Sequence, residues 1–343
     1  MQSEFRLAVL SILALILTLS SADAGPVLDR VRSRGVVHCG SYERPGIAND
    51  VGEAEAAVAD SAGQEPTTTP WHGLAVDLCR AVADAVLGSP DKIAFHSYEG
   101  GEDVEALTNG DDDIAFLTAT EMHATAMTGK VVPGPAIFVE SINVMLPASD
   151  AARGLADLDG NKGICVAAGS TAERVVAAYY GASKRSWLPH PYTEDGEMLD
   201  AYNVQACHAL AGERTWLAMQ ALEGGVNSLK STILPDALVA YPIMATTGSN
   251  DGVWASIVAW TVYTLEAGDR PSTDWTVGGV AAMPVPFTAE GLAVDWQTRL
   301  IKQFGSYGAV IERDLGAKSA LRLPAGLNRG PEHQGALIAP FLE

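Results

Sequence analysis

The sequence predicts an α/β protein built from two lobes. Short apolar runs alternate with segments of helical apolar spacing, a pattern typical of strand–helix units around a parallel or mixed sheet. Two extended segments, 136–146 and 238–244, lie between the two groups of such units and would connect the lobes twice. The length of 343 residues agrees with two lobes, because single hydrophobic cores stop growing near about 250–300 residues.

The first group of units follows the N-terminal segment, and glycine or Gly-Ser-Pro ends several of its elements. Its predicted strands are 35–40, 92–95 and 113–117, and its predicted helices are 78–87 and 104–109. Ala48–Pro70 is a long acidic loop without Lys or Arg, and loops of this length are usually functional or disordered.

The second group of units begins with a buried-looking strand at 163–168. The helix 170–180 follows, and Ser170 with Glu173 three residues later forms a capping-box pattern at its start. A helix at 198–203 and a strand at 207–211 repeat the arrangement, and helices at 256–266 and 296–304 complete the chain. Each lobe therefore has its own set of strands and helices.

The N-terminus predicts export from the cytoplasm. A polar start, Met1–Arg6, precedes Leu7–Leu19, which is apolar except for two residues, and Ala22-Asp23-Ala24 gives an A-x-A cleavage signal. This pattern predicts a secretory signal peptide over residues 1–24. Thirteen residues are too few to span about 30 Å of hydrocarbon, so a membrane anchor is disfavoured. No cysteine lies near the cleavage site, and we expect a free protein of the periplasm.

The cysteines fit an oxidising compartment. Their number is even in a chain with an export signal. No two lie close enough for a CxxC zinc knuckle, so no metal site is expected. Three pairings are possible; pairing of sequence neighbours gives one disulfide in each half of the chain, and four buried free thiols are the alternative. The four residues are Cys39, Cys79, Cys165 and Cys207.

Composition and charge exclude several classes of function. The chain has 22 Lys and Arg against 42 Asp and Glu, a net charge of −20. A nucleic-acid binder needs Lys and Arg for phosphate contacts, so this class is excluded. Hydrophobic residues make up 48% and charged residues 19%, which excludes a disordered chain. There is no G-x-S-x-G, HExxH or P-loop motif, and the seven histidines are scattered, so no enzymatic activity and no cofactor are expected.

Several segments together resemble the polar amino-acid solute-binding proteins of ABC importers (family 3), especially the general L-amino-acid-binding type. The matching segments, in order along nearly the whole mature chain, are 28–40, 71–83, 154–160 with 165–171, 301–308 and 312–316. The resemblance implies the two-lobed, type II periplasmic-binding-protein fold, with a ligand cleft between the lobes. It also implies lobe 1 over 25–142 and 243–343, lobe 2 over 143–242, two hinge strands and a hinge motion that changes the surface shown to a membrane permease.

The resemblance assigns ligand-binding positions, and the sequence departs from the family at some of them. The family's carboxylate-binding arginines fall on Leu117 and Thr125, and its ammonium-binding Asp falls on Glu213. A bidentate cation for the ligand carboxylate is therefore missing, while an acid for the ammonium is kept. The candidate ligand-binding residues are Trp71, Thr118, Thr120, Gly169, Ser170, Thr171 and Glu213.

A structural interpretation competes at each candidate. Ser170 is also explained as a helix N-cap, and Glu213 as a surface acid paired with Arg214. The two threonines of segment 118–120 and Trp71 are also explained as structural residues. Asp111-Asp112-Asp113, after Gly110, favours a solvated turn over a cation site.

The sequence therefore predicts a monomeric periplasmic substrate-binding component of an amino-acid-type ABC importer with an altered cleft. The expected partners are a small polar molecule, such as an amino acid or amine, and a membrane ABC permease. Losing a bidentate arginine contact of roughly 1.5–3 kcal/mol would weaken amino-acid binding ten- to a hundredfold. The alternatives are an accessory or scaffold protein of the periplasm with a degenerate cleft and, less favoured, a dehydratase-like enzyme on the same fold.

Overall fold

The computed structural model describes residues 25–50, 71–98, 102–158, 163–182, 189–223, 229–269 and 292–338. The expected signal peptide and residues 51–70 of the acidic loop lie outside these ranges. Within them, no helix combines the length and the apolar character needed to cross a membrane.

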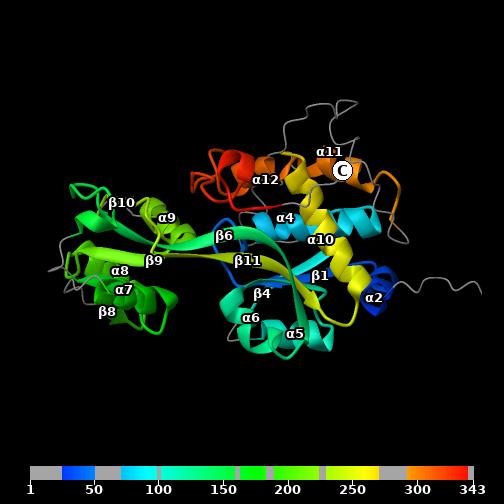
Figure 1. The fold of residues 1–343 in the computed structure, drawn as a ribbon, viewed down its shortest axis with the longest axis horizontal. Coiled ribbons are helices and arrows are strands. Elements are labelled where there is room, and N and C mark those ends of the chain that lie inside the picture. The colour runs from blue at the N-terminus through cyan, green and yellow to red at the C-terminus, as the bar shows by residue number, and fades with distance from the viewer. Residues whose placement is uncertain are drawn as a thin grey trace, which may run out of the picture.

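Two lobes are joined by two long antiparallel strands, β6 (Val131–Pro147) and β11 (Val239–Gly248), which run from one lobe into the other (Figure 1). Their register extends from Val239 opposite Ile142 to Gly248 opposite Val131. Nine of the described strands, drawn from both lobes, form one sheet in the order β4-β1-β5-β11-β6-β9-β7-β8, with β10 on β6. The predicted two-lobed α/β fold with two connecting strands is thus confirmed.

The first lobe holds both ends of the described chain. Its strands β1 (Val37–Ser41), β4 (Ile93–Ser97) and β5 (Ile114–Thr118) are parallel, and β2 (Asn49–Asp50) pairs with β3 (Trp71–His72). Its helices are α2 (Pro26–Arg34), α4 (Leu74–Leu87), α5 (Asp103–Asn109), α6 (Ala119–Ala126), α10 (Gly252–Ala267), α11 (Trp296–Phe304) and α12 (Tyr307–Asp314), followed by the short turn η3 (Pro331–His333). Gly88, at positive φ, ends α4 as the sequence predicts.

The second lobe has the same strand–helix organisation. After the turn η1 (Leu155–Asp157), its elements are β7 (Ile164–Ala167), α7 (Thr171–Ala182), β8 (Pro189–Tyr192), α8 (Asp195–Asn203), β9 (Ala209–Glu213), α9 (Arg214–Glu223) and β10 (Ser231–Ile233). Buried apolar side chains form separate clusters here, including one around Val176 and one around Met198. The expected lobe boundaries at 142 and 242 fall inside β6 and β11, and they stay a prediction.

Each lobe contains one disulfide. Cys39–Cys79 ties β1 to α4, and Cys165–Cys207 ties β7 to the segment before β9. The pairing of sequence neighbours is confirmed, and the described residues contain no free cysteine. Closing loops of 40 and 42 residues stabilises the fold by about 4 kcal/mol each in the chain-entropy model.

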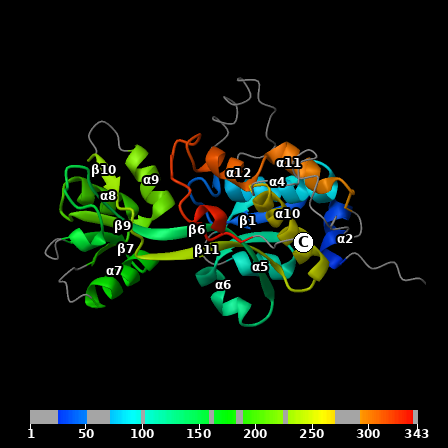
Figure 2. The ribbon, with the colours of Figure 1, turned by 45° about the horizontal axis from the view of Figure 1, so that its top comes forward.

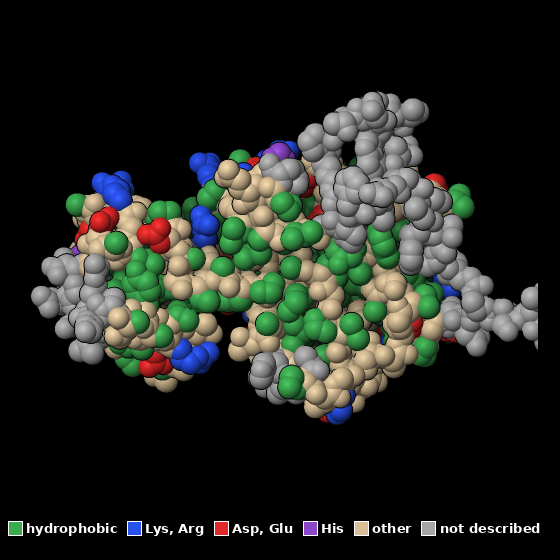
Figure 3. Space-filling model, viewed as in Figure 1, with side chains coloured by type: hydrophobic (Ala, Val, Ile, Leu, Met, Phe, Trp, Pro, Cys, Tyr) green, Lys and Arg blue, Asp and Glu red, His purple; other side chains and the backbone are tan. Residues whose placement is uncertain are grey.

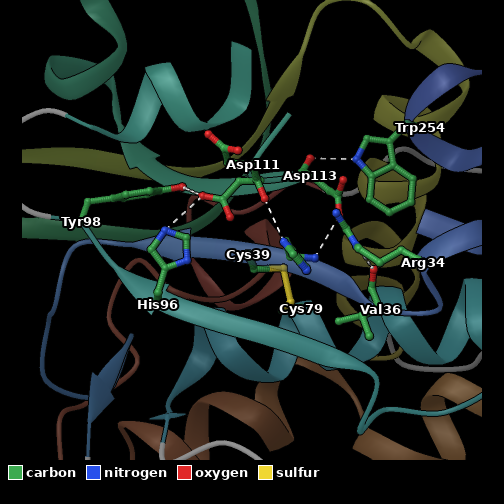
Figure 4. Close-up of a disulfide and its surroundings, with 11 residues drawn as sticks. Arg34, Val36, Cys39, Cys79, His96, Tyr98, Asp111, Asp113 and Trp254 are labelled. Carbon is green, nitrogen blue, oxygen red and sulfur yellow. Dashed lines mark hydrogen bonds and ion pairs between the residues drawn. A yellow bond between two sulfur atoms is a disulfide. The ribbon is translucent and has the colours of Figure 1, made fainter. Parts of the chain in front are cut away.

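The acidic run after Gly110 is not a solvated turn, so that expectation is wrong. Asp112 and Asp113 are both buried. The Asp113 carboxylate accepts hydrogen bonds from Arg30, Arg34 and the backbone N–H of His38, and Figure 4 shows Arg34 directed at it close to the Cys39–Cys79 disulfide. Asp113 therefore anchors helix α2 and strand β1, and the described residues contain no cluster of His, Cys, Asp or Glu suited to a metal ion.

Candidate functional site

The carboxyl ends of the parallel strands carry the candidate site. In the first lobe β1 ends at Ser41 and β5 at Thr118, and in the second lobe β7 ends at Ala167 and β9 at Glu213. Open α/β sheets bind ligands outside these strand ends. Figure 3 shows the outline of the molecule notched between the lobes on both sides of the hinge strands.

One arginine links the two lobes. Arg44 follows β1 and is 6% exposed; its Nη2 donates to Glu121 Oε1 at 2.5 Å, and its Nε lies 3.7 Å from Glu213 Oε2. Burial acts to lower the pKa of Arg44, but the two carboxylates outweigh it and leave the pKa above its usual value. Arg44 is thus a fixed cation shared by an acid from each lobe.

Glu121 is held in place by the start of helix α6. The backbone N–H of Thr118 donates to Glu121 Oε2 at 2.7 Å, and the backbone N–H of Glu121 donates to Thr118 Oγ1 at 3.3 Å. This is a capping box, and it supports the structural interpretation of Thr118, which is buried. Thr120 is exposed on α6.

Glu213 lies at the end of β9, and its partner differs from the one expected. Its Oε1 accepts a hydrogen bond of 2.7 Å from Tyr241 Oη, and its ion pair is with Arg44. No ion pair forms between Glu213 and Arg214, so that expectation is wrong for the described residues. Glu213 ends β9 and Arg214 begins α9, where the backbone N–H of Arg214 donates to Glu140.

A cavity of about 210 Å³ lies beside Glu213, between β9 and the starts of α7, α8 and α9. Ser170, Thr171 and Glu213 all line it, so the structure brings three of the candidate residues together. Its other walls come from Ile142, Ala167, Ala172, Asp195, Met198, Ala211, Gly212 and Trp216. Among these described lining residues two are acids and none is Lys or Arg.

Ser170 caps helix α7, as its sequence pattern predicts. Its Oγ accepts a hydrogen bond of 3.1 Å from the backbone N–H of Glu173, while Glu173 Oε2 accepts one of 2.6 Å from the N–H of Gly169. Gly169 adopts the positive φ of +73° that this turn requires. The carboxylate of Glu173 thus faces the positive end of the helix, which weakens this end as a site for a ligand anion.

Trp71 lies away from this cavity. It is half-buried on β3, with its ring centroid 5.6 Å from that of Phe95, and it packs against the core of the first lobe. The structure therefore separates Trp71, Thr118 and Thr120 from the cavity of Ser170, Thr171 and Glu213.

The residues missed at the sequence level are Arg44, Glu121, Tyr241, Asp195 and Trp216. Arg44 had one usable signal, since it closely follows a strand of a parallel sheet, where ligand-binding side chains gather. Asp195 has the same signal, since it begins α8 shortly after strand β8 ends at Tyr192. Tyr241 lies within a hinge strand and Trp216 within a helix, and neither carries a signal of its own.

Comparison with known proteins gives a consistent set of relatives. No protein-family model matches the chain. The putative amino-acid ABC transporter-binding protein YhdW of Escherichia coli strain K12 is 27% identical, with 98% of each chain covered. The general L-amino acid-binding periplasmic protein AapJ of Rhizobium johnstonii is 27% identical over 94% of each chain. The glutamate/glutamine/aspartate/asparagine-binding protein BztA of Rhodobacter capsulatus is 28% identical over 95% of this chain and 96% of BztA.

A solved structure extends this similarity to three dimensions. The ABC transporter periplasmic binding protein of Brucella ovis, with glutathione bound, matches with a TM-score of 0.70 and 25% identity, covering 92% of this chain and 99% of that one. The expected resemblance to solute-binding proteins is confirmed. These relatives are binding proteins of transporters and not enzymes, as the sequence predicts for this chain.

Proposed function

We propose that this chain, a homologue of the amino-acid-binding proteins of ABC transporters, is the periplasmic solute-binding component of an ABC importer and that its cleft captures a small molecule through an ammonium group. The observation that carries this proposal is the acidic wall of the 210 Å³ cavity, where Glu213 and Asp195 face the space without a cation among the described lining residues. An ammonium group gains charge-assisted hydrogen bonds from such acids.

The described residues of this region offer fewer partners for the carboxylate of an α-amino acid than for its ammonium group. Leu117, at a position of a family arginine, is fully buried in β5. Arg44 already faces two carboxylates, and Glu173 faces the start of α7. The acids of this region therefore outnumber its cations, which favours amines over amino acids.

The ion pair of Arg44 with Glu213 suggests how ligand and lobes are coupled. The pair joins the two lobes beside the hinge strands, at 3.7 Å. A ligand ammonium would take the place of Arg44 as the partner of Glu213, while Arg44 keeps Glu121. Such an exchange changes the contacts between the lobes and provides the differential affinity that a hinge motion requires.

Matched pairs of ligands test the proposal. We expect cadaverine to bind the purified chain 25–343 about tenfold or more tighter than lysine, and agmatine tighter than arginine, because each amine lacks the carboxylate that the cleft repels. Isothermal titration calorimetry measures both pairs, and glutathione, present in the Brucella ovis structure, completes the panel. Binding of lysine or arginine as tight as that of the matching amine, or micromolar binding of glutathione, would contradict the selectivity for amines.

Two matched variants locate the binding. Glu213→Gln removes the charge from the cavity wall and should abolish amine binding, whereas Glu197→Gln changes an exposed acid of α8 outside the cavity and should leave it unchanged. If the unmodified chain binds no member of the panel, the accessory or scaffold role becomes the better account.

A further inference from the structure

A second cavity, of about 300 Å³, lies on the other side of the hinge strands from α6 and α7. Its floor is the segment of β6 around Glu140, and its sides come from α9 in one lobe and from α12 with the segment 323–329 in the other. Figures 1 and 2 show α9 and α12 flanking the hinge strands on this side. The cavity is therefore separate from the one beside Glu213, although both border the hinge.

Arg214 is a cation in this cavity that pairs with no carboxylate of the described residues. Arg214 begins α9 in the second lobe, and its guanidinium extends to Gly326 of the first lobe. A methyl group on Gly326 would lie 3.6 Å from Arg214 Nη1. Its Nε is buried without a hydrogen-bond partner, and within the described chain no acid forms an ion pair with it. Burial lowers the pKa of Arg214 despite the nearby Glu140. Arg329 adds a second, exposed cation to the lining.

The acid in the cavity floor is already engaged elsewhere. Glu140 Oε1 accepts hydrogen bonds from the backbone N–H groups of Ser141 (2.8 Å) and Arg214 (3.2 Å), and its Oε2 accepts one of 2.5 Å from Thr215 Oγ1. The carboxylate thus caps the start of α9 and does not pair with the Arg214 guanidinium. Among the described lining residues, the charged groups left to bind an occupant are therefore the cations Arg214 and Arg329.

Several other residues that line this cavity are apolar. Phe138, Ile311, Leu315 and Leu323 line the cavity together with Pro324. We propose that this cavity is a second binding site, which holds a small carboxylate with an apolar body through Arg214 and Arg329. Because its walls come from both lobes, its occupant binds best at one hinge angle and influences lobe closure. This site is independent of the amine site proposed for the cleft.

Benzoate is a suitable probe, with benzyl alcohol as the uncharged match. Titration calorimetry on the chain 25–343 compares the unmodified protein with Arg214→Gln, Arg329→Gln and Arg322→Gln. Arg322 is an exposed arginine beside the cavity segment that does not line the cavity, so it controls for general surface charge. Glu213→Gln, in the other cavity, shows whether the probe uses the cleft.

We expect benzoate to bind and benzyl alcohol to bind about tenfold more weakly or not at all. Arg214→Gln should weaken benzoate binding about tenfold and Arg329→Gln about threefold, while Arg322→Gln and Glu213→Gln leave it within about twofold. Absence of benzoate binding, equal binding of benzyl alcohol, or equal affinities in the unmodified chain, Arg214→Gln and Arg329→Gln would overturn the proposal. Arg329 is exposed, so its variant keeps the test decisive if Arg214→Gln does not fold.

Discussion

The two sides of the hinge differ in the sign of the charge that they present. On one side Glu213 and Asp195 line a cavity without a cation among the described lining residues, and on the other Arg214 and Arg329 face a cavity whose one acid is engaged. The difference arises at a single dipeptide, Glu213-Arg214, where β9 passes into α9. The two neighbouring side chains line different cavities, so one junction supplies both sites with opposite chemistry.

The net charge of −20 therefore does not describe either cavity. Recognition depends on the few charges that face the enclosed space, and these are set by local register. We expect the two sides to respond differently to the same ligands and to the same kind of substitution.

The largest effect is expected from removing the cation that the cleft acids share. Arg44→Ala leaves Glu121 without its buried partner and Glu213 without its ion pair, and should destabilise the fold by about 2–4 kcal/mol. Urea unfolding measures the change, with Arg153→Ala on an exposed site as the control. A loss of stability equal to that of the control would mean that Arg44 is not the electrostatic centre of the cleft.

The acid behind the hinge gives the next largest effect, and it depends on pH. Burial, together with the charge of Glu213, raises the pKa of Glu140 from 4.5 to about 7. The folded protein therefore binds this proton more tightly than the unfolded chain, so the contribution of Glu140 to stability decreases as pH rises from about 4.5 to about 7.

Glu140→Gln removes this dependence and can keep the hydrogen bonds, because its amide oxygen accepts from the backbone and its nitrogen donates to Thr215. The variant should match the unmodified chain at about pH 4, where the carboxyl is protonated in both the folded and the unfolded chain, and be more stable by on the order of 3 kcal/mol at about pH 8. Urea unfolding at both pH values measures the difference. The raised pKa of Asp314 is present in both proteins and cancels. If Glu140→Gln and the unmodified chain differed in stability by the same amount at both pH values, the pH dependence would not come from Glu140.

Sequence reasoning succeeds where the signal is local. Ser170 and Glu173 stand three residues apart and cap α7, and each cysteine pair lies within one set of strand–helix units. The order of strands and helices follows from apolar periodicity for the same reason.

The same reasoning fails where distant segments meet. Arg44 lies 77 residues before Glu121, and its partners become visible only when the parallel strands are in register. Asp113 is buried because Arg30 and Arg34 of α2 form ion pairs with it. The run of three acids contains no pattern that predicts this burial. The second cavity depends on the irregular segment 323–329, which has no periodicity to read.

The smallest expected effect comes from Tyr241, the hinge tyrosine whose hydroxyl donates to Glu213 on the acidic side. Tyr241→Phe removes the 2.7 Å hydrogen bond to Glu213 and should reduce stability by about 1 kcal/mol. Tyr263→Phe, on the half-buried face of α10, is the matched control and should change stability by less. Amine binding should change in Tyr241→Phe because Glu213 loses its positioning partner, whereas benzoate binding should not. A change in benzoate affinity as large as that in amine affinity would show that the two sides of the hinge are not chemically separate.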